Sequence, residues 1–221
     1  LIIAIIGMGR HLKHTHSPLL NFSLFKNAGI RARAINFFIL QFSNIGIAFV
    51  IPIFAENVLH TNASVAGLLL LPGSLIGAAV SPIGGALYDR FGARRLLLTS
   101  NAAMIVGAVL LGSFTHQLSI PLIVGFYIIF RMGFNLGFGN TMSDASTMVS
   151  GPAKADINTL FNTIQQYAGS LGTASLSAII TFQNRLSPSG ADATGSQIDF
   201  ILLAVLALLT FMVQWRLHAS K

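Results

Sequence analysis

The feature that most constrains the fold is a short charged segment, residues 84–95, which reads GGALYDRFGARR. Apolar runs of about 20 residues lie on both sides of it, and that is the length of helix that crosses the hydrocarbon core of a bilayer. The whole chain is 53% hydrophobic and only 9% charged, which excludes an ordinary soluble domain. We therefore predict a tight loop between two membrane-spanning helices. Its cluster of arginines indicates that the loop lies on the cytoplasmic side.

The other apolar runs predict an all-α membrane protein with six complete transmembrane helices. Leu1 stands within an apolar run, so residues 1–8 are expected to be the end of a truncated helix of a longer protein. Residues 9–33 carry several cations and are expected to form a basic cytoplasmic linker. Residues 34–221 are expected to form a six-helix C-terminal domain. Its predicted spans are residues 34–54, 65–88, 96–114, 120–140, 158–182 and 198–215.

The distribution of Lys and Arg between these spans predicts the orientation. The outer loops hold only Arg185, and Arg131 lies within a span. This bias predicts a multi-pass plasma-membrane protein with a cytoplasmic C-terminus. The net charge of +7 then reflects topology and contact with the lipid bilayer, so nucleic acid is not expected as a partner. The inner segments hold Arg10, Lys13, Lys26, Arg31, Arg33, Arg90, Arg94, Arg95, Lys154, Arg216 and Lys221.

Catalytic and metal-binding chemistry is not expected from this sequence. The chain has no cysteine, and no pairing of a nucleophile with a base stands out. His11, His14 and His16 fall in the predicted linker, where solvated side chains are expected rather than a metal site. We therefore expect no enzyme activity, no metal and no cofactor.

The charged segment resembles the G-x-L-x-D-R-x-G-R-[RK] signature of the major facilitator superfamily of transporters. In that family the signature lies between the second and third helices of a six-helix half. Ala93 departs from it, because the family usually has a base there. The resemblance implies one half of a major facilitator bundle, in which this loop governs conformational exchange; a generic basic loop is the alternative. The residues that it assigns to conformational gating are Gly85, Asp89, Arg90, Gly92, Arg94 and Arg95.

Three residues of this segment have physical roles that can be predicted directly. Gly85 is expected to let two helices approach closely. Asp89 is expected to face the N-terminus of a helix, where negative charge is favoured. Gly92 is expected to supply the positive φ that a tight reversal needs.

Arg131 is the one cation predicted at membrane depth, where a charge is costly unless it meets a partner or water. Asn135 lies four residues on and therefore shares its face. Gly133 and Gly137 form a small-xxx-small pair that predicts close helix packing. The stretch also resembles the R-x-x-x-G motif of the family's fourth helix, which implies a role in proton transfer or in cavity polarity. The alternative is a structural arginine that bonds to a neighbouring helix.

The fifth predicted span carries a polar stripe at helical spacing. It resembles the N-x-x-R-Q-x-G-x-x-G-x-A stretch of the fourteen-helix drug:proton antiporters of the EmrB/QacA type, with Gln165 in place of the usual Arg. The stripe is expected to face another helix or a wet cavity, and interhelical hydrogen bonding is the alternative to transport. The residues predicted to line the substrate or proton pathway are Arg131, Asn135, Gln41, Asn44, Asn162, Gln165 and Gln166.

The resemblance implies a fragment of a multidrug efflux transporter, which exports lipophilic or amphipathic compounds in exchange for protons by alternating access. Its expected partners are a small lipophilic substrate, protons and the N-terminal half of the same chain. The six acidic residues all fall near span ends or in loops, so the carboxylate that couples protons is expected in that N-terminal half. The alternatives are a major facilitator transporter for a specific metabolite or lipid, or a membrane module that does not transport.

Overall fold

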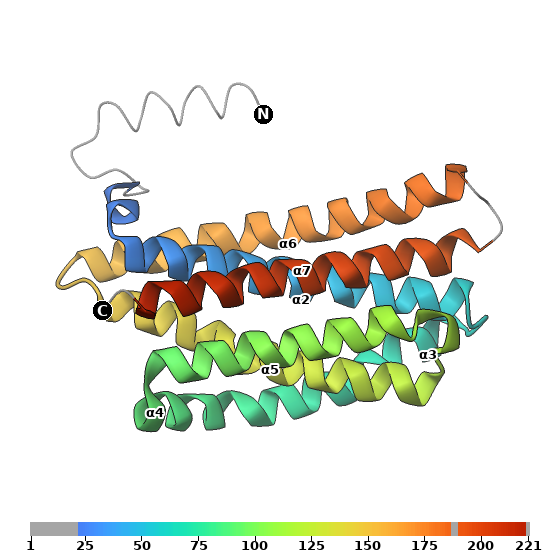
Figure 1. The fold of residues 1–221 in the computed structure, drawn as a ribbon, viewed down its shortest axis with the longest axis horizontal. Helices are drawn as coiled ribbons and strands as arrows, with labels where there is room; N and C mark the ends of the chain where they lie inside the picture. The colour runs from blue at the N-terminus through green and yellow to red at the C-terminus, as the bar shows by residue number, and fades with distance from the viewer. Residues whose placement is uncertain (1–21, 187–189, 220–221) are drawn as a thin grey trace.

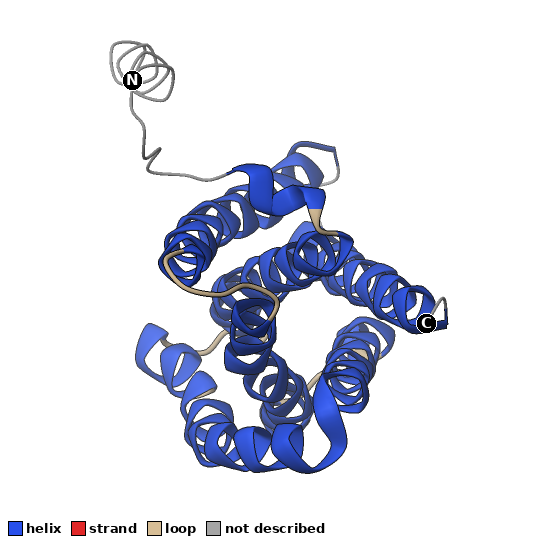
Figure 2. Cartoon of the chain, turned by 90° about the vertical axis from the view of Figure 1, so that its left-hand side faces the viewer, coloured by secondary structure: helices blue, strands red, loops and turns tan. Residues whose placement is uncertain are grey.

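The computed structural model describes residues 22–186 and 190–219, and within these ranges it contains helices and no strand (Figure 1). The long helices run roughly side by side along the longest axis of the molecule. Figure 2 looks down that axis, so that each helix is seen nearly end-on. Residues 1–21, which include the predicted helix end and most of the predicted linker, lie outside the described residues. The elements are η1 (Phe22–Lys26), α2 (Ala28–Asn57), α3 (Ala63–Leu68), α4 (Leu70–Ser113), η2 (Thr115–Gln117), α5 (Ile120–Thr147), α6 (Ala153–Leu186) and α7 (Ala191–Ala219).

Four stretches of the described chain are long and apolar enough to cross a membrane, which supports a multi-pass membrane protein. They are Ala28–Asn57, Ala63–Ser113, Ile120–Thr147 and Asp192–Arg216. The second is 51 residues long, about twice the length that one crossing needs. Helix α6 is not among the four, because its composition is too polar. Six complete spans, as predicted from the sequence, are therefore not confirmed.

Helix α4 is a hairpin of two helical arms that meet at Gly92. Figure 1 shows the arms side by side, with their junction at the end of the bundle that also carries the C-terminus. Gly92 has φ 76° and ψ 164°, a backbone conformation that essentially only glycine adopts. The predicted positive φ is thus confirmed. We call residues 70–91 the first arm of α4 and residues 93–113 its second arm.

Close packing between α5 and the second arm of α4 depends on glycine. A Cβ atom at Gly133 would lie 2.7 Å from the carbonyl oxygen of Ser100, and one at Gly137 would meet the Ser100 hydroxyl. That hydroxyl donates a 2.7 Å hydrogen bond to the carbonyl of Gly133. The predicted packing of this glycine pair is confirmed. The close approach predicted for Gly85 is not found among the described residues, because a Cβ atom at Gly85 would meet none of them within 4 Å, whereas one at Gly84 would lie 3.0 Å from the amide nitrogen of Asn140 on α5.

The bundle interior is apolar and has two parts. The larger core joins α2, α4, α5, α6 and α7 around side chains such as Phe54, Tyr127 and Phe200, each 1% exposed. A smaller core packs Leu24 of η1 against the start of α2, the end of α5 and the start of α6. It includes the rings of Phe37 and Phe161. The η1 segment is therefore held against the bundle rather than projecting from it.

The cations gather at one end of the bundle. Of the Lys and Arg residues that the structure describes, Arg185 lies at the end of α6 near Gly190, and Arg131 lies between the two ends. The others lie at the end where the arms of α4 meet. They are Lys26, Arg31, Arg33, Arg90, Arg94, Arg95, Lys154 and Arg216.

Candidate functional site

Arg131 lies inside the bundle, where it binds across to α2. It stands about 16 Å along α5 from the first residue of that helix. A terminal nitrogen of its guanidinium donates a hydrogen bond to the side-chain oxygen of Asn44, and the group lies over the ring of Phe134, 5.2 Å from the centroid. Its Nε is buried without a partner among the described residues. Among the described residues, no carboxylate forms an ion pair with the Arg131 guanidinium.

The first arm of α4 closes against the same part of α5. Glycines of this arm leave no room for side chains: a Cβ atom at Gly73 would lie 2.5 Å from the ring of Tyr127, and one at Gly77 would meet Asn135. Asn135 does share the face of Arg131, but its amide donates back to the Arg131 carbonyl at 2.9 Å. Arg131 thus lies where α2, α5 and the first arm of α4 meet.

A buried ion pair, which the sequence did not reveal, lies nearer the cationic end. Arg33 Nε of α2 donates to Asp144 Oδ2 of α5 at 2.6 Å, and the two residues are 3% and 7% exposed. Tyr88 of α4 donates to the other carboxylate oxygen at 2.8 Å. Gln214 of α7 accepts from Arg33 and donates to the Ala32 carbonyl at 3.3 Å. Four helices therefore converge on one charge pair.

This ion pair corrects two assignments from the sequence. Arg33 was predicted in the linker, but α2 begins at Ala28 and carries Arg33 into the bundle. Asp144 was predicted in a cytoplasmic connection, but α5 extends to Thr147 and buries it. Both helices run beyond the apolar runs that defined the predicted spans, and the two charges meet each other inside the bundle.

A further polar contact lies between the ion pair and Arg131. Asn36 of α2 donates to the Thr141 hydroxyl of α5 at 2.9 Å, and it accepts from Asn101 of α4 at 2.9 Å. Because α2 and α5 are antiparallel, the contacts follow one another like rungs over about 16 Å of α2. We call this set the polar ladder. Its rungs are Arg33–Asp144, Asn36–Thr141 and Asn44–Arg131.

Gln41 lies on α2 between the last two rungs. It is 7% exposed, and its side-chain oxygen is buried without a hydrogen-bond partner in the described chain. Of the pathway residues predicted from the sequence, the structure brings Arg131, Asn135 and Asn44 together, and it places Gln41 on the intervening stretch of α2.

The polar residues of α6 do not join the ladder. Asn162 and Gln166 are exposed and Gln165 is half-buried, and in the described part of the chain their side chains make no hydrogen bond to another helix. The buried face of α6 is built from small and apolar residues instead. There Gly172 packs so closely on α2 that a Cβ atom would meet the Phe42 carbonyl oxygen.

The gating residues predicted from the signature lie at the turn of the α4 hairpin. Asp89, Arg90, Arg94 and Arg95 are all exposed. The guanidinium of Arg94 lies 5.6 Å from the ring centroid of Trp215 on α7. This segment adjoins the polar ladder, because Tyr88 immediately precedes Asp89.

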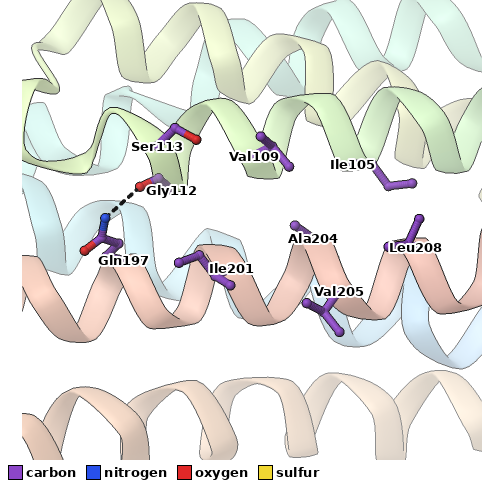
Figure 3. A pocket seen from close by; sticks show the side chains of 9 residues that line it. All are labelled: Ile105, Val109, Gly112, Ser113, Gln197, Ile201, Ala204, Val205 and Leu208. Atoms are coloured by element: carbon purple, nitrogen blue, oxygen red, sulfur yellow. Dashed lines mark hydrogen bonds between the residues drawn. The ribbon is translucent and has the colours of Figure 1, made fainter.

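An apolar groove of about 410 Å³ lies apart from the ladder, between the second arm of α4 and α7 (Figure 3). Its polar contact is a hydrogen bond of 3.1 Å from the Gln197 amide to the Gly112 carbonyl. Its α7 wall consists of Ile201, Ala204, Val205 and Leu208, and aliphatic side chains of this kind suit contact with lipid.

The sequence also missed a buried carboxyl in α7. The predicted span began at residue 198, but the helix begins at Ala191, and Asp199 is 0% exposed. The expectation that the acidic residues lie near span ends or in loops gave no indication that Asp199 is buried. The signal was a single acid between Ile198 and Phe200, followed by an apolar run.

Comparison with known proteins gives a consistent result. The family described as "Major Facilitator Superfamily" matches residues 8–173. An "Uncharacterized MFS-type transporter YhcA" of Bacillus subtilis is 28% identical over 81% of this chain and 34% of its own length. A "Multidrug resistance protein B homolog" of Mycobacterium tuberculosis is 27% identical over 76% of the chain and 32% of its own length. A "Lincomycin resistance protein LmrB" of Listeria monocytogenes is 24% identical over 81% of this chain and 38% of its own length. The chain spans about a third of the length of these relatives.

Proposed function

Because this chain belongs to the Major Facilitator Superfamily, we propose that it is the C-terminal half of a multidrug efflux transporter of the fourteen-helix type. In this proposal six transmembrane helices, with α6 among them, form one half of the transporter. The other half would come from an N-terminal region of the same protein. Lipophilic or amphipathic compounds leave the cell in exchange for protons while the two halves rock about a central site. The family is one of transporters, which points away from an enzyme.

The observation that carries the proposal is Arg131. It is half-buried near the middle of α5, it bonds to the neutral amide of Asn44, and no carboxylate of the described chain neutralises it. A charge held in this way at membrane depth is costly and usually serves a substrate or ion pathway. Several relatives are named as multidrug proteins, among them a "Multidrug efflux pump LfrA" of Mycolicibacterium smegmatis that is 25% identical over 78% of this chain.

The polar ladder and the α4 hairpin supply the gating in this proposal. The hairpin segment with Asp89, Arg90, Arg94 and Arg95 would rearrange at the cytoplasmic surface when the halves rock. Tyr88 joins that segment to Asp144, so a movement of the hairpin is transmitted to the ladder. The exposed amides of α6, Asn162 and Gln166, would face the central cavity between the two halves.

The test is transport by the full-length protein in proteoliposomes, with a fluorescent lipophilic cation as substrate and an imposed proton gradient. Wild-type protein is expected to move the dye against its gradient. Arg131→Lys keeps the charge and should retain part of the transport, whereas Arg131→Ala should abolish it while the protein still elutes as a folded species. The control is Arg185→Ala. Arg185 is an exposed cation at the end of the bundle opposite the α4 turn, and its substitution should leave transport normal.

Three outcomes would contradict the proposal. Equal transport by wild type and Arg131→Ala would remove Arg131 from the pathway. Loss of folded protein in both Arg131 variants would identify a structural arginine, since a lysine cannot reproduce its fork of donors. Absence of dye transport by well-folded wild type would favour a transporter for a specific metabolite or lipid, or a membrane module that does not transport.

A further inference from the structure

Asp199 is buried in α7 without a hydrogen-bond partner in the described chain. Its side chain is 0% exposed, and neither carboxylate oxygen accepts a hydrogen bond from the described residues. Ser196 lies one turn earlier on the same side of the helix, and it is also 0% exposed with an unpartnered hydroxyl. Buried polar groups in proteins are almost always paired. The unpaired carboxylate of Asp199 therefore requires an explanation.

Asp199 lies at the start of the apolar part of α7. It stands eight residues after Ala191, the start of the helix, which is about 12 Å along the axis. Apolar residues follow it almost continuously as far as Val213. In the candidate span from Asp192 to Arg216, Asp199 thus lies where the polar start of α7 passes into its apolar run.

Among the described residues, no cation is placed to neutralise Asp199. Helices α2, α4 and α6 and the segment η2 pack against α7. On α2, Arg33 is held by Asp144 near the opposite end, and Glu56 is exposed. The remaining charged and titratable groups of these elements lie at helix ends: Arg31 on α2, Tyr88, Asp89, Arg90, Arg94 and Arg95 on α4, Lys154, Asp156 and Arg185 on α6, and His116 on η2, with Tyr167 exposed along α6.

An ionised carboxylate that is buried without a partner is very unfavourable, whereas a neutral carboxylic acid is tolerated. We propose that Asp199 is a proton-binding site, which holds a proton in the conformation seen here and releases it to water when the helices around α7 move apart. The reaction is simple dissociation of the carboxylic acid to a carboxylate and a proton. This inference rests on the proposed function, because it assigns part of the proton coupling to this half of the protein.

The proton site is connected to the polar ladder through α7. Asp199 and Thr210 are eleven residues apart, which is close to three whole turns, so both lie on the same face of the helix. Thr210 donates to Asn101 at 3.4 Å, and Asn101 donates to Asn36 of the ladder. A movement of α7 that exposes Asp199 would therefore also move Thr210, which lies about 16 Å farther along the same helix.

The direct test is infrared spectroscopy of the full-length protein in lipid at neutral pH. The carbonyl stretching band of a protonated carboxylic acid should be present in wild type and lost in Asp199→Asn. The matched control is Asp192→Asn, which alters an acid of the same helix that accepts from Asn184 at 3.1 Å near the helix start. This control should leave the band unchanged. If the Asp199→Asn spectrum matches wild type in this region, the proposal is wrong.

Transport provides the second readout. Asp199→Asn is expected to lose dye transport driven by a pH gradient, while exchange of dye across the membrane without a gradient continues. If dye transport by Asp199→Asn depends on the pH gradient as it does in wild type, the proposal is wrong. The carboxylic acid band could be present in wild type and lost in Asp199→Asn although the wild-type protein does not transport the lipophilic cation. In that case the proton site stands and the proposed drug-efflux function fails.

Discussion

At the scale of single residues, the two arginines inside the bundle are held in different ways. Arg33 is neutralised by Asp144, and Gln214 occupies a second part of its guanidinium. Arg131 has only the neutral oxygen of Asn44 and the face of Phe134 among the described residues. The first arrangement suits a permanent structural contact. The second leaves a positive charge for an anionic or polar group to approach.

The ion pair therefore makes a prediction about stability. Asp144→Asn removes the counter-charge of Arg33 and leaves the guanidinium buried, so the unfolding free energy should fall by about 3–5 kcal/mol. Arg33→Met should have a similar effect, and the double variant should lose much less than the sum. Chemical unfolding of the full-length protein in detergent measures all three. Asp89→Asn changes an exposed acid near the same end and is the control, with little expected effect. Additive losses would show that the two residues are not coupled.

At the scale of elements, the α4 hairpin shows how a tight reversal is made without a loop. Helical residues continue directly on both sides of Gly92, and the whole change of direction falls on its φ of 76° and ψ of 164°. Lack of room is not the constraint at this position, since a Cβ atom on Gly92 would meet none of the described residues within 4 Å. The requirement for glycine is therefore a property of the backbone.

Substitution of the hairpin glycine should be costly even though the site is open. Gly92→Ala forces a residue with a Cβ into a conformation that costs about 1–3 kcal/mol, so the thermal unfolding midpoint of the full-length protein should decrease. Gly85→Ala is the matched control, because Gly85 is equally open and has no positive φ. A midpoint for Gly92→Ala as high as that of Gly85→Ala would mean that the backbone relaxes elsewhere.

At the scale of the whole molecule, the gathering of cations at one end predicts the orientation. Ser64 lies at the start of α3 and Ser150 lies between α5 and α6, at opposite ends of the bundle, and both are exposed. In intact cells, a membrane-impermeant thiol reagent should label Ser64→Cys but not Ser150→Cys, because Lys and Arg collect on the cytoplasmic side. The chain has no cysteine of its own. Opening the cells should expose Ser150→Cys, and labelling of that variant before opening would reverse the topology.

The sequence alone determined the features that depend on neighbouring residues. Apolar runs of helical length specify a multi-pass membrane protein, and the position of Gly92 between two such runs specifies the reversal. The small residues Gly133 and Gly137 specify close packing, because a helix presents residues four apart on one face. The signature around Asp89 is likewise a local pattern, and its residue types and spacing are sufficient to indicate the family.

Only the tertiary structure decided which polar residues are buried and what they meet. Arg33 and Asp144 are 111 positions apart, and Arg33 and Gln214 are 181 apart, so no local pattern could pair them. The apolar runs instead place Arg33 and Asp144 outside the predicted spans and Asp199 at the start of the last span, and they do not indicate that any of the three is buried. Whether a charge lies in water or in the bundle depends on the partner that packing brings to it, because the partner offsets part of the cost of burial. For Asp199, packing brings none, and that absence of a partner in the described chain is the basis of its proposed role.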